Sequence, residues 1–439
     1  MARAGLKACA TEPKVRTTTP GMSIIRIIDS SDTRAVDALL SPRRADDRAV
    51  MRRVSRIVDA VRAEGDAAVR RYAAQFDGFD GPFEIPRSAW KAEARKAARD
   101  VRDALKVAAA NIARVAQAQR PLSRRVRVAP GVTVEQRVRP LDRVGCYVPA
   151  GRYPLPSSLL MTAIPAAAAG VEEVVAVCPR PAPVVMAAAL EAGVSRLFRV
   201  GGAHAVAALA YGTDTIPRVD KIVGPGNRYV AAAKALVAAD CGIDFYAGPT
   251  EIVIVAARGP ASWIAADLIA QAEHDPDARA VFITPSRKLA EQVVAQVATQ
   301  LPEAGPARAA LKSHGGVIVT KTAAEAVALA NTAAPEHLVV DDERMAKQVR
   351  CTGSLFVCAW TAQVAGDYAI GSNHVLPTAG AARVRGGLSA ADFVRQITVQ
   401  RLTAAGLRRI GPTVIDLATA EGLSAHAASV AIRMKGTRS

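Results

Sequence analysis

Short β-rich runs alternate with Ala-rich helical segments along the middle of the chain, and this pattern constrains the fold more than any other feature. The predicted strand–helix pairs are 173–178 with 182–192, 197–200 with a helix from 203, 221–223 with 227–239, 251–256 with 262–273, 280–284 with 288–300, and 316–320 with 323–332. Such alternation is typical of βαβ units in parallel sheets. Six units are more than one sheet holds comfortably, so we expect an α/β protein with two Rossmann-like parallel sheets.

The segments on either side of this region differ from it. A short apolar strand is predicted at 24–28, long helices at 47–76 and 88–119, and strand-like alternation of valines at 126–138. Residues 388–439 look helical again and are expected to join no sheet. The predicted division is a disordered or non-native N-terminal extension (1–22), a mainly helical region contributing to the first large domain (23–140), a Rossmann-like domain (141–250), a second Rossmann-like domain (251–387) and a C-terminal helical tail (388–439).

The composition indicates a folded protein of the cytoplasm. The chain has 439 residues, of which 50% are hydrophobic and only 4% aromatic, so two or three cores must be built from Ala, Val, Leu and Ile. No apolar run is long enough to predict a membrane span, and the basic first 21 residues lack the apolar segment of a secretory signal. Six cysteines occur without paired spacing, which is typical of reduced thiols.

The formal net charge of +17 raises the question of nucleic-acid binding. Residues 101–140 alone hold nine Lys or Arg and two acids. They contain no aromatic residue for stacking on bases, and the chain carries no nucleic-acid-binding motif. We therefore interpret the basic stretch as a solvated helix face or a patch that attracts an anionic cofactor, and we expect no nucleic-acid partner.

Two glycine-rich turns follow predicted strands. Gly201–Gly202 and the run 224–227 (Gly-Pro-Gly-Asn) each precede a helix whose N-terminus can face a phosphate. In parallel sheets a ligand binds beyond the carboxyl ends of the strands, where these turns fall. Neither is GxGxxG, so each turn taken alone is explained equally well as a tight connection.

A carboxylate and an imidazole, Glu336 and His337, stand side by side where a predicted helix gives way to a strand-like run. Such a pair can act together in proton transfer, for which histidine is suited because its unperturbed pKa is about 6.5. In isolation, a surface glutamate beside a capping histidine explains the pair as well.

The remaining polar candidates are dispersed along the chain. Gln271 and His274 lie three residues apart near the end of one predicted helix, and so share a face. The loop 366–377 is rich in Gly, Asp, Asn and His, which favours a functional site containing Asp367 and His374.

Glu421 and His426 belong to the C-terminal tail, where an exposed cap explains them when they are considered alone. Together with His426, the residues Gln271, His274 and Asp367 make a mixed nitrogen and oxygen set. That set suits zinc with one position left for substrate.

Taken in order, these segments resemble the histidinol dehydrogenase family. The matching stretches are 144–149 (VGCYVP), 201–203 (GGA), 219–227 (VDKIVGPGN), 247–251 (AGPTE), 271–274 (QAEH), 334–338 (APEHL), 366–368 (GDY), 373–378 (NHVLPT) and 421–426 (EGLSAH). The likeness runs from about residue 24 to about residue 433, and so many motifs in one order exclude chance agreement.

The resemblance implies a zinc-dependent, NAD-linked oxidation of L-histidinol through L-histidinal to L-histidine, the last step of histidine biosynthesis. It implies two NAD⁺ per reaction, one zinc per subunit, and a homodimer with shared active sites. The domain 141–250 would bind NAD, the domain 251–387 would carry zinc and the acid–base pair, and the tail would reach the partner's site.

The resemblance also assigns roles to individual residues. Glu336 and His337 would be the catalytic pair, with His337 taking the hydroxyl proton and Glu336 activating the water that hydrates the aldehyde. The implied zinc ligands are Gln271, His274, Asp367 and, from the partner subunit, His426. The implied substrate contacts are these four ligands with Thr250, His337, His374 and Glu421. The implied NAD contacts are Tyr147, His204 and Asn227.

Two positions depart from the family's pattern. His204 stands where the family usually has Gln, and Thr250 where it usually has Ser. The first departure leaves open a paralogous zinc and NAD dehydrogenase that acts on another small polyol or amino alcohol. A second alternative is a basic nucleic-acid-binding α/β protein without catalysis. Glu421 and the complete ligand set argue against the first alternative, and the intact acid–base pair argues against the second.

Overall fold

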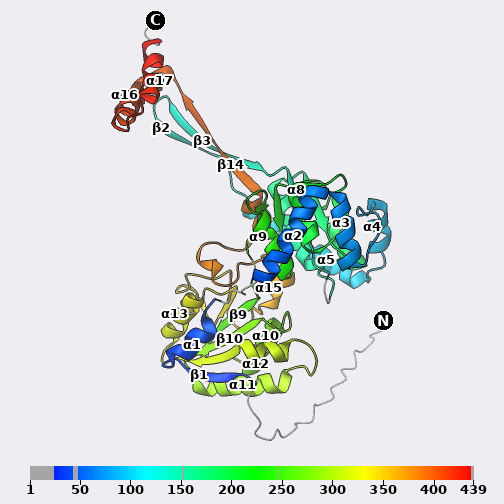
Figure 1. Cartoon of the computed structure of the whole chain (residues 1–439). Helices are drawn as coiled ribbons and strands as arrows, with labels where there is room; N and C mark the ends of the chain where they lie inside the picture. The colour runs from blue at the N-terminus through cyan, green and yellow to red at the C-terminus, as the bar shows by residue number, and fades with distance from the viewer. Residues whose placement is uncertain (1–23, 43–47, 151–152, 247, 437–439) are drawn as a thin grey trace, which may run out of the picture.

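The computed structural model describes residues 24–42, 48–150, 153–246 and 248–436, and the predicted extension 1–22 lies outside them. Two parallel sheets form the body, which confirms the predicted fold class, and a three-stranded antiparallel sheet extends from it (Figure 1). Within the described ranges, no helix is long and apolar enough to cross a membrane.

The first domain is built on a five-stranded parallel sheet. Its strand order is β6 (Arg196–Phe198), β5 (Glu173–Val177), β4 (Arg143–Tyr147), β7 (Lys221–Val223) and β8 (Gly242–Ile243). One face is covered by α4 (Arg87–Ala94), α5 (Arg99–Ala118), α6 (Pro156–Ala169) and α7 (Pro183–Glu191). The other face is covered by α2 (Arg48–Glu64), α3 (Asp66–Tyr72), α8 (Gly202–Tyr211) and α9 (Arg228–Val237).

The second domain is built on a six-stranded parallel sheet. Its order is β1 (Arg26–Asp29), β11 (Gly315–Val319), β10 (Arg279–Thr284), β9 (Glu251–Val255), β12 (His337–Val340) and β13 (Ser354–Val357). The helices α10 (Ala261–Ala272), α11 (Arg287–Gln300) and α12 (Ala307–His314) pack on one face. The helices α1 (Thr33–Leu40), α13 (Ala323–Ala333) and α14 (Glu343–Ala346) pack on the other.

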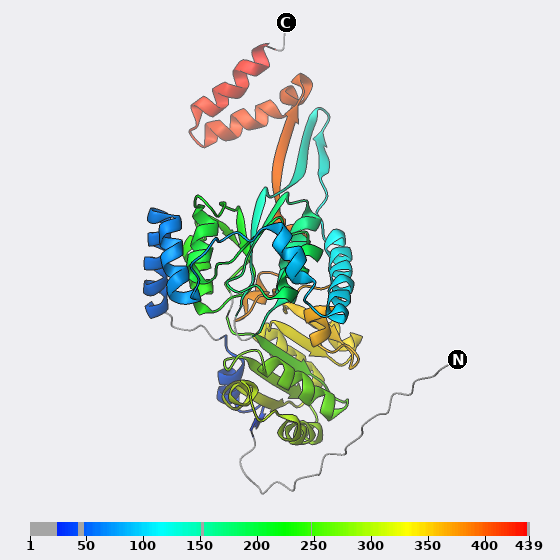
Figure 2. The same ribbon diagram turned by 90° about the vertical axis from the view of Figure 1, so that its right-hand side faces the viewer.

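A long arm projects from the first domain. It is a ribbon of β2 (Arg124–Ala129), β3 (Val132–Pro140) and β14 (Val394–Leu402), with α16 (Ala404–Ala420) and α17 (Ser424–Gly436) at its far end (Figure 2). Between the second sheet and the arm the chain forms α15 (Val364–Tyr368) and two 3₁₀ turns at Ala381–Arg383 and Ala390–Phe393. The tip helices therefore lie far from the body of their own chain.

Several predicted boundaries were wrong. The helix expected at 47–76 breaks at Gly65, whose φ of 56° belongs to the left-handed region, and continues as α3 and a π-helical turn at Ala73–Asp77. The helix expected at 88–119 is two helices, α4 and α5. The alternating stretch 126–138 is two strands joined by a turn at Gly131.

Two segments were expected in the wrong place. The tail is not purely helical, because β14 pairs with β3 along nine residues. We expected residues 23–140 to contribute to the first domain, yet β1 pairs with β11 at the edge of the second sheet. A strand's own sequence pattern does not specify which sheet its backbone joins, because the partner strand lies far away in sequence.

Candidate active site

The polar candidates gather at the amino ends of β9 and β12. Glu251 is the first residue of β9, and His337, the first residue of β12, pairs with Ile252 beside it. Ala334 ends α13 in the left-handed conformation, with φ of 47°, so the chain turns sharply and Glu336 enters the site just before the strand. Neighbouring strand ends thus bring Glu336 and His337 against the residues around Glu251.

Glu336 is a buried carboxyl held by fixed donors. The residue is 6% exposed, and Oε2 accepts hydrogen bonds from Thr250 Oγ1 at 2.5 Å and from the Glu251 backbone N–H at 2.9 Å. Burial raises the pKa of Glu336 to about 8, although the hydrogen bond from Thr250 opposes the rise. A carboxyl with this pKa exchanges its proton close to physiological pH, as an acid–base catalyst must.

His337 is a buried neutral imidazole. Its Nδ1 lies 3.2 Å from the backbone oxygen of Glu251, and because a carbonyl only accepts, Nδ1 carries the proton. Burial lowers the pKa of His337 to about 4, so the ring is neutral at pH 7. Its Nε2 has no hydrogen-bond partner among the described residues and lies 3.8 Å from Asp367 Oδ1. The bare Nε2 lone pair is therefore free to accept a proton.

The predicted zinc ligands Gln271, His274 and Asp367 come from the end of α10 and from α15. Gln271 is fully buried; its Nε2 donates to Thr250 Oγ1 at 2.5 Å, while its Oε1 has no partner in the described chain. Burial raises the pKa of Asp367, and the nearby imidazoles of His337 and His274 lower it. An orphaned amide oxygen, a buried carboxylate and an imidazole are a donor set that fits zinc.

The set is incomplete in one chain. No group of three His, Cys, Asp or Glu side chains in the described ranges is arranged to hold a metal by itself. The fourth predicted ligand, His426, lies on α17 at the end of the arm, and Glu421 caps α16 beside it. Both are exposed, and the helices α16 and α17 stand far from the body (Figure 1). The structure thus does not bring these two residues to the site of their own chain.

The other side of the site belongs to the first domain. His374 Nδ1 donates to the backbone oxygen of Asp367 at 3.0 Å, and its Nε2 lies 3.5 Å from Ser158 Oγ near the start of α6. Asn373 donates to the backbone oxygen of Met161 at 2.6 Å. Since α6 follows β4, the carboxyl edge of the first sheet faces the amino edge of the second across this site.

Two of the predicted NAD contacts lie at that carboxyl edge. Tyr147 ends β4, and its hydroxyl accepts a hydrogen bond from the Gly202 N–H at 3.0 Å. Asn227 is exposed and caps α9 by accepting from the backbone of Tyr229 and Val230. The strand order reverses between β4 and β7 at this point, where doubly wound sheets bind ligands.

The third predicted contact, His204, is fully buried behind the Gly201–Gly202 turn. Its Nε2 lies 3.3 Å from Asp77 Oδ2, and its ring contacts those of Tyr72 and Phe76. The Asp77 carboxylate also accepts from the backbone N–H of Gly201 at 3.3 Å. Because His204 has no exposed surface, the structure does not place its ring where a ligand at the turn could contact it.

Comparison with known proteins identifies the family of this chain. Residues 40–434 match the sequence profile of the histidinol dehydrogenase family. The chain belongs to the histidinol dehydrogenase family. Histidinol dehydrogenase 1 of Nostoc sp. is 44% identical over 429 residues, which cover 95% of this chain and 100% of that protein. Histidinol dehydrogenase of Rhizobium meliloti is 45% identical over 424 residues, covering 93% and 98%.

The same assignment holds for the three-dimensional structure. The crystal structure of histidinol dehydrogenase from Elizabethkingia anophelis superposes with a TM-score of 0.91 at 31% sequence identity, covering 95% of this chain and 100% of that one. With this coverage, the structural similarity to that enzyme includes the arm as well as the two domains.

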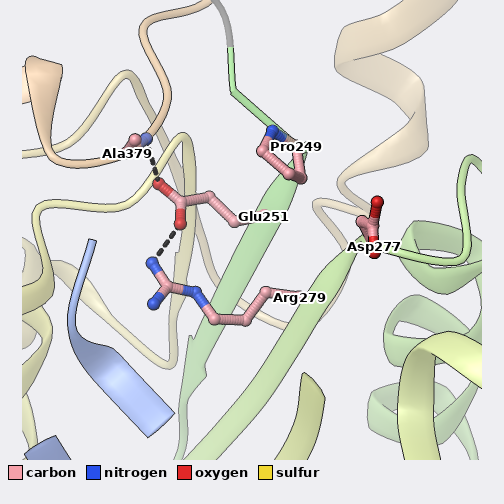
Figure 3. A pocket seen from close by; sticks show the side chains of 5 residues that line it. All are labelled: Pro249, Glu251, Asp277, Arg279 and Ala379. Carbon is pink, nitrogen blue, oxygen red and sulfur yellow. Dashed lines mark hydrogen bonds and ion pairs between the residues drawn. The ribbon is translucent and has the colours of Figure 1, made fainter. Parts of the chain in front are cut away.

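One functional neighbour was missed from the sequence. Glu251 forms a buried ion pair with Arg279 and accepts from the backbone N–H of Ala379 at 3.1 Å (Figure 3). Arg279 also donates to the backbone oxygens of Leu39 and Ser41. This network fixes the start of β9, whose backbone holds both Glu336 and His337. The available signal was a charged residue at the head of an otherwise apolar strand.

Proposed function

We propose that this chain oxidises L-histidinol through L-histidinal to L-histidine with two NAD⁺, the last step of histidine biosynthesis, as a cytoplasmic homodimer with one zinc per subunit. The observation that carries the proposal is the pairing of a neutral imidazole, His337, with a buried carboxyl, Glu336, beside an orphaned amide oxygen of Gln271. The family membership of the chain supports the choice of substrate.

His337 removes the hydroxyl proton in each oxidation. Its Nδ1–H is held by the Glu251 backbone oxygen, which fixes the tautomer and directs the Nε2 lone pair into the site. The positive charge that the ring gains is then stabilised by Asp367, whose carboxylate lies 3.8 Å from Nε2. Before the second step, the imidazolium releases this proton to solvent and returns to the neutral imidazole.

Glu336 activates the water that hydrates the aldehyde between the two oxidations. Its deprotonated form accepts the water proton, and the donors on Oε2, from Thr250 and the Glu251 N–H, stabilise that form. Thr250 is oriented in turn by Gln271, so a single chain of hydrogen bonds links the candidate ligand to the carboxyl. Thr250 therefore keeps the role of the usual family serine through its hydroxyl.

The bound groups complete the chemistry. Gln271 Oε1, His274, Asp367 and the His426 of a second copy would hold zinc, which would orient the imidazole and amino groups of the substrate. The carboxyl ends of the strands in the first sheet would hold NAD⁺, which would supply the hydride acceptor. Tyr147 and Asn227 contact NAD directly, whereas the buried His204 does not. Glu421 of the second copy, Thr250 and His374 contact the substrate.

The arm supports a homodimer with shared sites. Apolar side chains that a monomer would leave in water occur along its ribbon and at its tip. They are Val126, Val128, Ile397, Leu402, Val414, Leu417, Leu423 and Ile432, all 37% exposed or more. A second copy seated on the arm buries this surface and brings its own site to Glu421 and His426. We propose no nucleic-acid or membrane partner.

Purified protein with L-histidinol and NAD⁺ tests the reaction. We expect about two NADH per L-histidinol, loss of turnover with a chelator and recovery with zinc, because a single four-ligand set holds one metal per chain. Absence of NADH with L-histidinol, alongside turnover of another amino alcohol, would reject the substrate.

Mixing of inactive variants tests the shared site. Subunits of His274→Ala and His426→Ala, mixed and exchanged, form heterodimers with one intact site, so we expect about a quarter of the wild-type activity. The matched control mixes His274→Ala with Asp367→Asn, which damage the same half of the site and give no recovery. Equal activity in both mixtures would reject the arrangement.

A further inference from the structure

In the second sheet, the candidate active site lies at the amino ends of β9 and β12, and a separate hollow lies at their carboxyl ends. From β9 the chain builds outward through β10 and β11 and then returns to place β12 on the opposite side of β9. The crevice beyond the carboxyl ends of β9 and β12 is thus a topological switch point, the usual ligand position in such sheets. Glu336 and His337 occupy the amino ends of the same region, so the carboxyl crevice remains unassigned.

A hollow of about 410 Å³, which includes space open to solvent, lies in that crevice. It is lined by the segments that follow β9, β12 and β13 and by the first turns of α10. The lining side chains that matter for recognition are Arg258, Trp263, Asp267, Asp341, Cys358 and Thr361. The hollow is therefore a concave site with both aromatic and acidic walls.

One tryptophan forms the aromatic wall, and a second packs against it at the rim. Trp263 lines the hollow and is 41% exposed, and Trp360, between two lining residues, is 83% exposed. Their rings meet edge to face, with centroids 5.1 Å apart and planes at 61°. The chain has only three tryptophans, so two of them share one exposed cluster. An indole face attracts cations and flat apolar groups.

Asp267 supplies an unpaired negative charge. Burial raises the pKa of its carboxyl to about 6, and no hydrogen bond or charge from the described residues offsets this rise. Asp341 uses only Oδ2, which accepts from the backbone N–H groups of Ala257 and Arg258. The Arg258 side chain is 82% exposed and lies 3.9 Å from Asp342, which does not line the hollow. Arg258 acts electrostatically on Asp341, whereas Asp267 faces the hollow with no charged neighbour that shifts its pKa.

We propose that this hollow binds a small organic cation, an ammonium group on an apolar or aromatic body, with Trp263 and Trp360 against the body and Asp267 as the counter-charge. A cation between the indoles and the carboxylate gains cation–π attraction and relieves the desolvation of Asp267. An anion would meet two carboxyls, and a neutral ring would leave Asp267 unpaired. The site goes beyond the proposed oxidation and contains none of its residues.

The wall formed by residues 358–361 is held in a strained conformation. Cys358 has a φ of 71°, in the left-handed region, although it is not glycine. Its backbone N–H donates to Val340 at 2.9 Å, and its oxygen accepts from the Thr361 N–H at 3.1 Å. Such strain persists where the surroundings fix it, often at ligand sites. The hydrogen bond with the Thr361 hydroxyl lowers the pKa of the exposed Cys358 thiol, which makes this residue a chemical reporter at the rim.

The probe for the test is benzyltrimethylammonium, titrated calorimetrically into the full-length protein. We expect Asp267→Asn to weaken binding about tenfold and Trp360→Leu about fivefold. Trp360 is so exposed that its replacement leaves the fold intact, which keeps the test valid if the first variant proves unstable. The control Glu291→Gln removes an exposed carboxylate on α11, outside the hollow, and leaves binding unchanged.

Alkylation of Cys358 by N-ethylmaleimide gives a second readout. Saturating probe slows the labelling of Cys358, identified by mass spectrometry, and benzenesulfonate, an anion with the same ring, does not. Equal protection by benzenesulfonate, no protection at all, or binding unaffected by both variants overturns the proposal. The test requires neither L-histidinol nor NAD⁺, so its result is independent of the proposed oxidation.

Discussion

Asp267 allows the cost of an unpaired carboxyl to be worked out and measured. Its pKa stands at about 6 in the folded protein, against an ordinary value of 3.8, because burial penalises the charged form. The folded state therefore holds the proton more tightly than the unfolded state, and stability falls as pH rises through the window from 3.8 to about 6. Each pKa unit corresponds to about 1.4 kcal/mol, and water at the mouth of the hollow screens part of the effect, so the charged carboxylate destabilises the fold by about 2 kcal/mol.

The substitution Asp267→Asn keeps the shape and removes the titration. We expect the variant to gain stability over the wild type by about 1 kcal/mol more at about pH 8 than at about pH 4.5, because only the wild type pays for deprotonation. Urea unfolding followed by tryptophan fluorescence suits the test, since Trp263 and Trp360 both belong to the second domain. Glu291→Gln controls for the loss of one negative charge. A difference between variant and wild type that stays constant, or shrinks as pH rises, would refute the reasoning.

Three further substitutions test the site, the turn and the arm. Glu336→Gln keeps an acceptor for the donors on Oε2 but cannot take a proton, so oxidation of L-histidinal should slow by about 10²-fold or more. The circular dichroism spectrum should be unchanged. Normal turnover would contradict the role of Glu336 as the base that activates water. Gly224→Ala places a Cβ against the Tyr147 backbone oxygen at a φ of 115°, so KM for NAD⁺ should rise and stability fall by about 2 kcal/mol; unchanged kinetics and melting would count against it. In Gly406→Ala the new Cβ would clash with the backbone oxygen of Gly131 in the arm, so light scattering should detect weaker dimers. Undiminished association would exclude a role of the arm in dimer formation.

The parallel sheets were predictable because their strands are buried on both faces. The run 251–255 is buried at every position, and such continuous apolar segments between helices have few other solutions. The strand β14 was not predictable in the same way. Most of its residues are exposed, so it lacks the alternation that marks a half-buried strand, and its partner β3 lies far away in sequence. Its only local signal was a β-branched run at 397–399.

The candidate site was predictable in its residue types but not in its electrostatics. The sequence indicates that Glu336 and His337 are adjacent, but only burial against Thr250 and the Glu251 backbone separates their pKa values to about 8 and about 4. The sequence also could not indicate that His204 lies beside Asp77, because this pair forms across two helices of the first domain. Burial and long-range contact are properties of the packed chain rather than of local spacing.

One helix, α10, runs from the hollow at the carboxyl ends of the strands to the candidate active site at their amino ends. Trp263, Asp267 and Gln271 are spaced four residues apart along α10, so they lie along one face at intervals of about 6 Å. Trp263 and Asp267 line the hollow, and Gln271 presents its amide oxygen to the candidate zinc site. Gln271 is oriented by one hydrogen bond to Thr250, so a small shift of α10 changes that orientation directly. If a cation in the hollow changes the affinity of the protein for zinc by some factor, zinc must change the affinity for the cation by the same factor, because linkage is reciprocal.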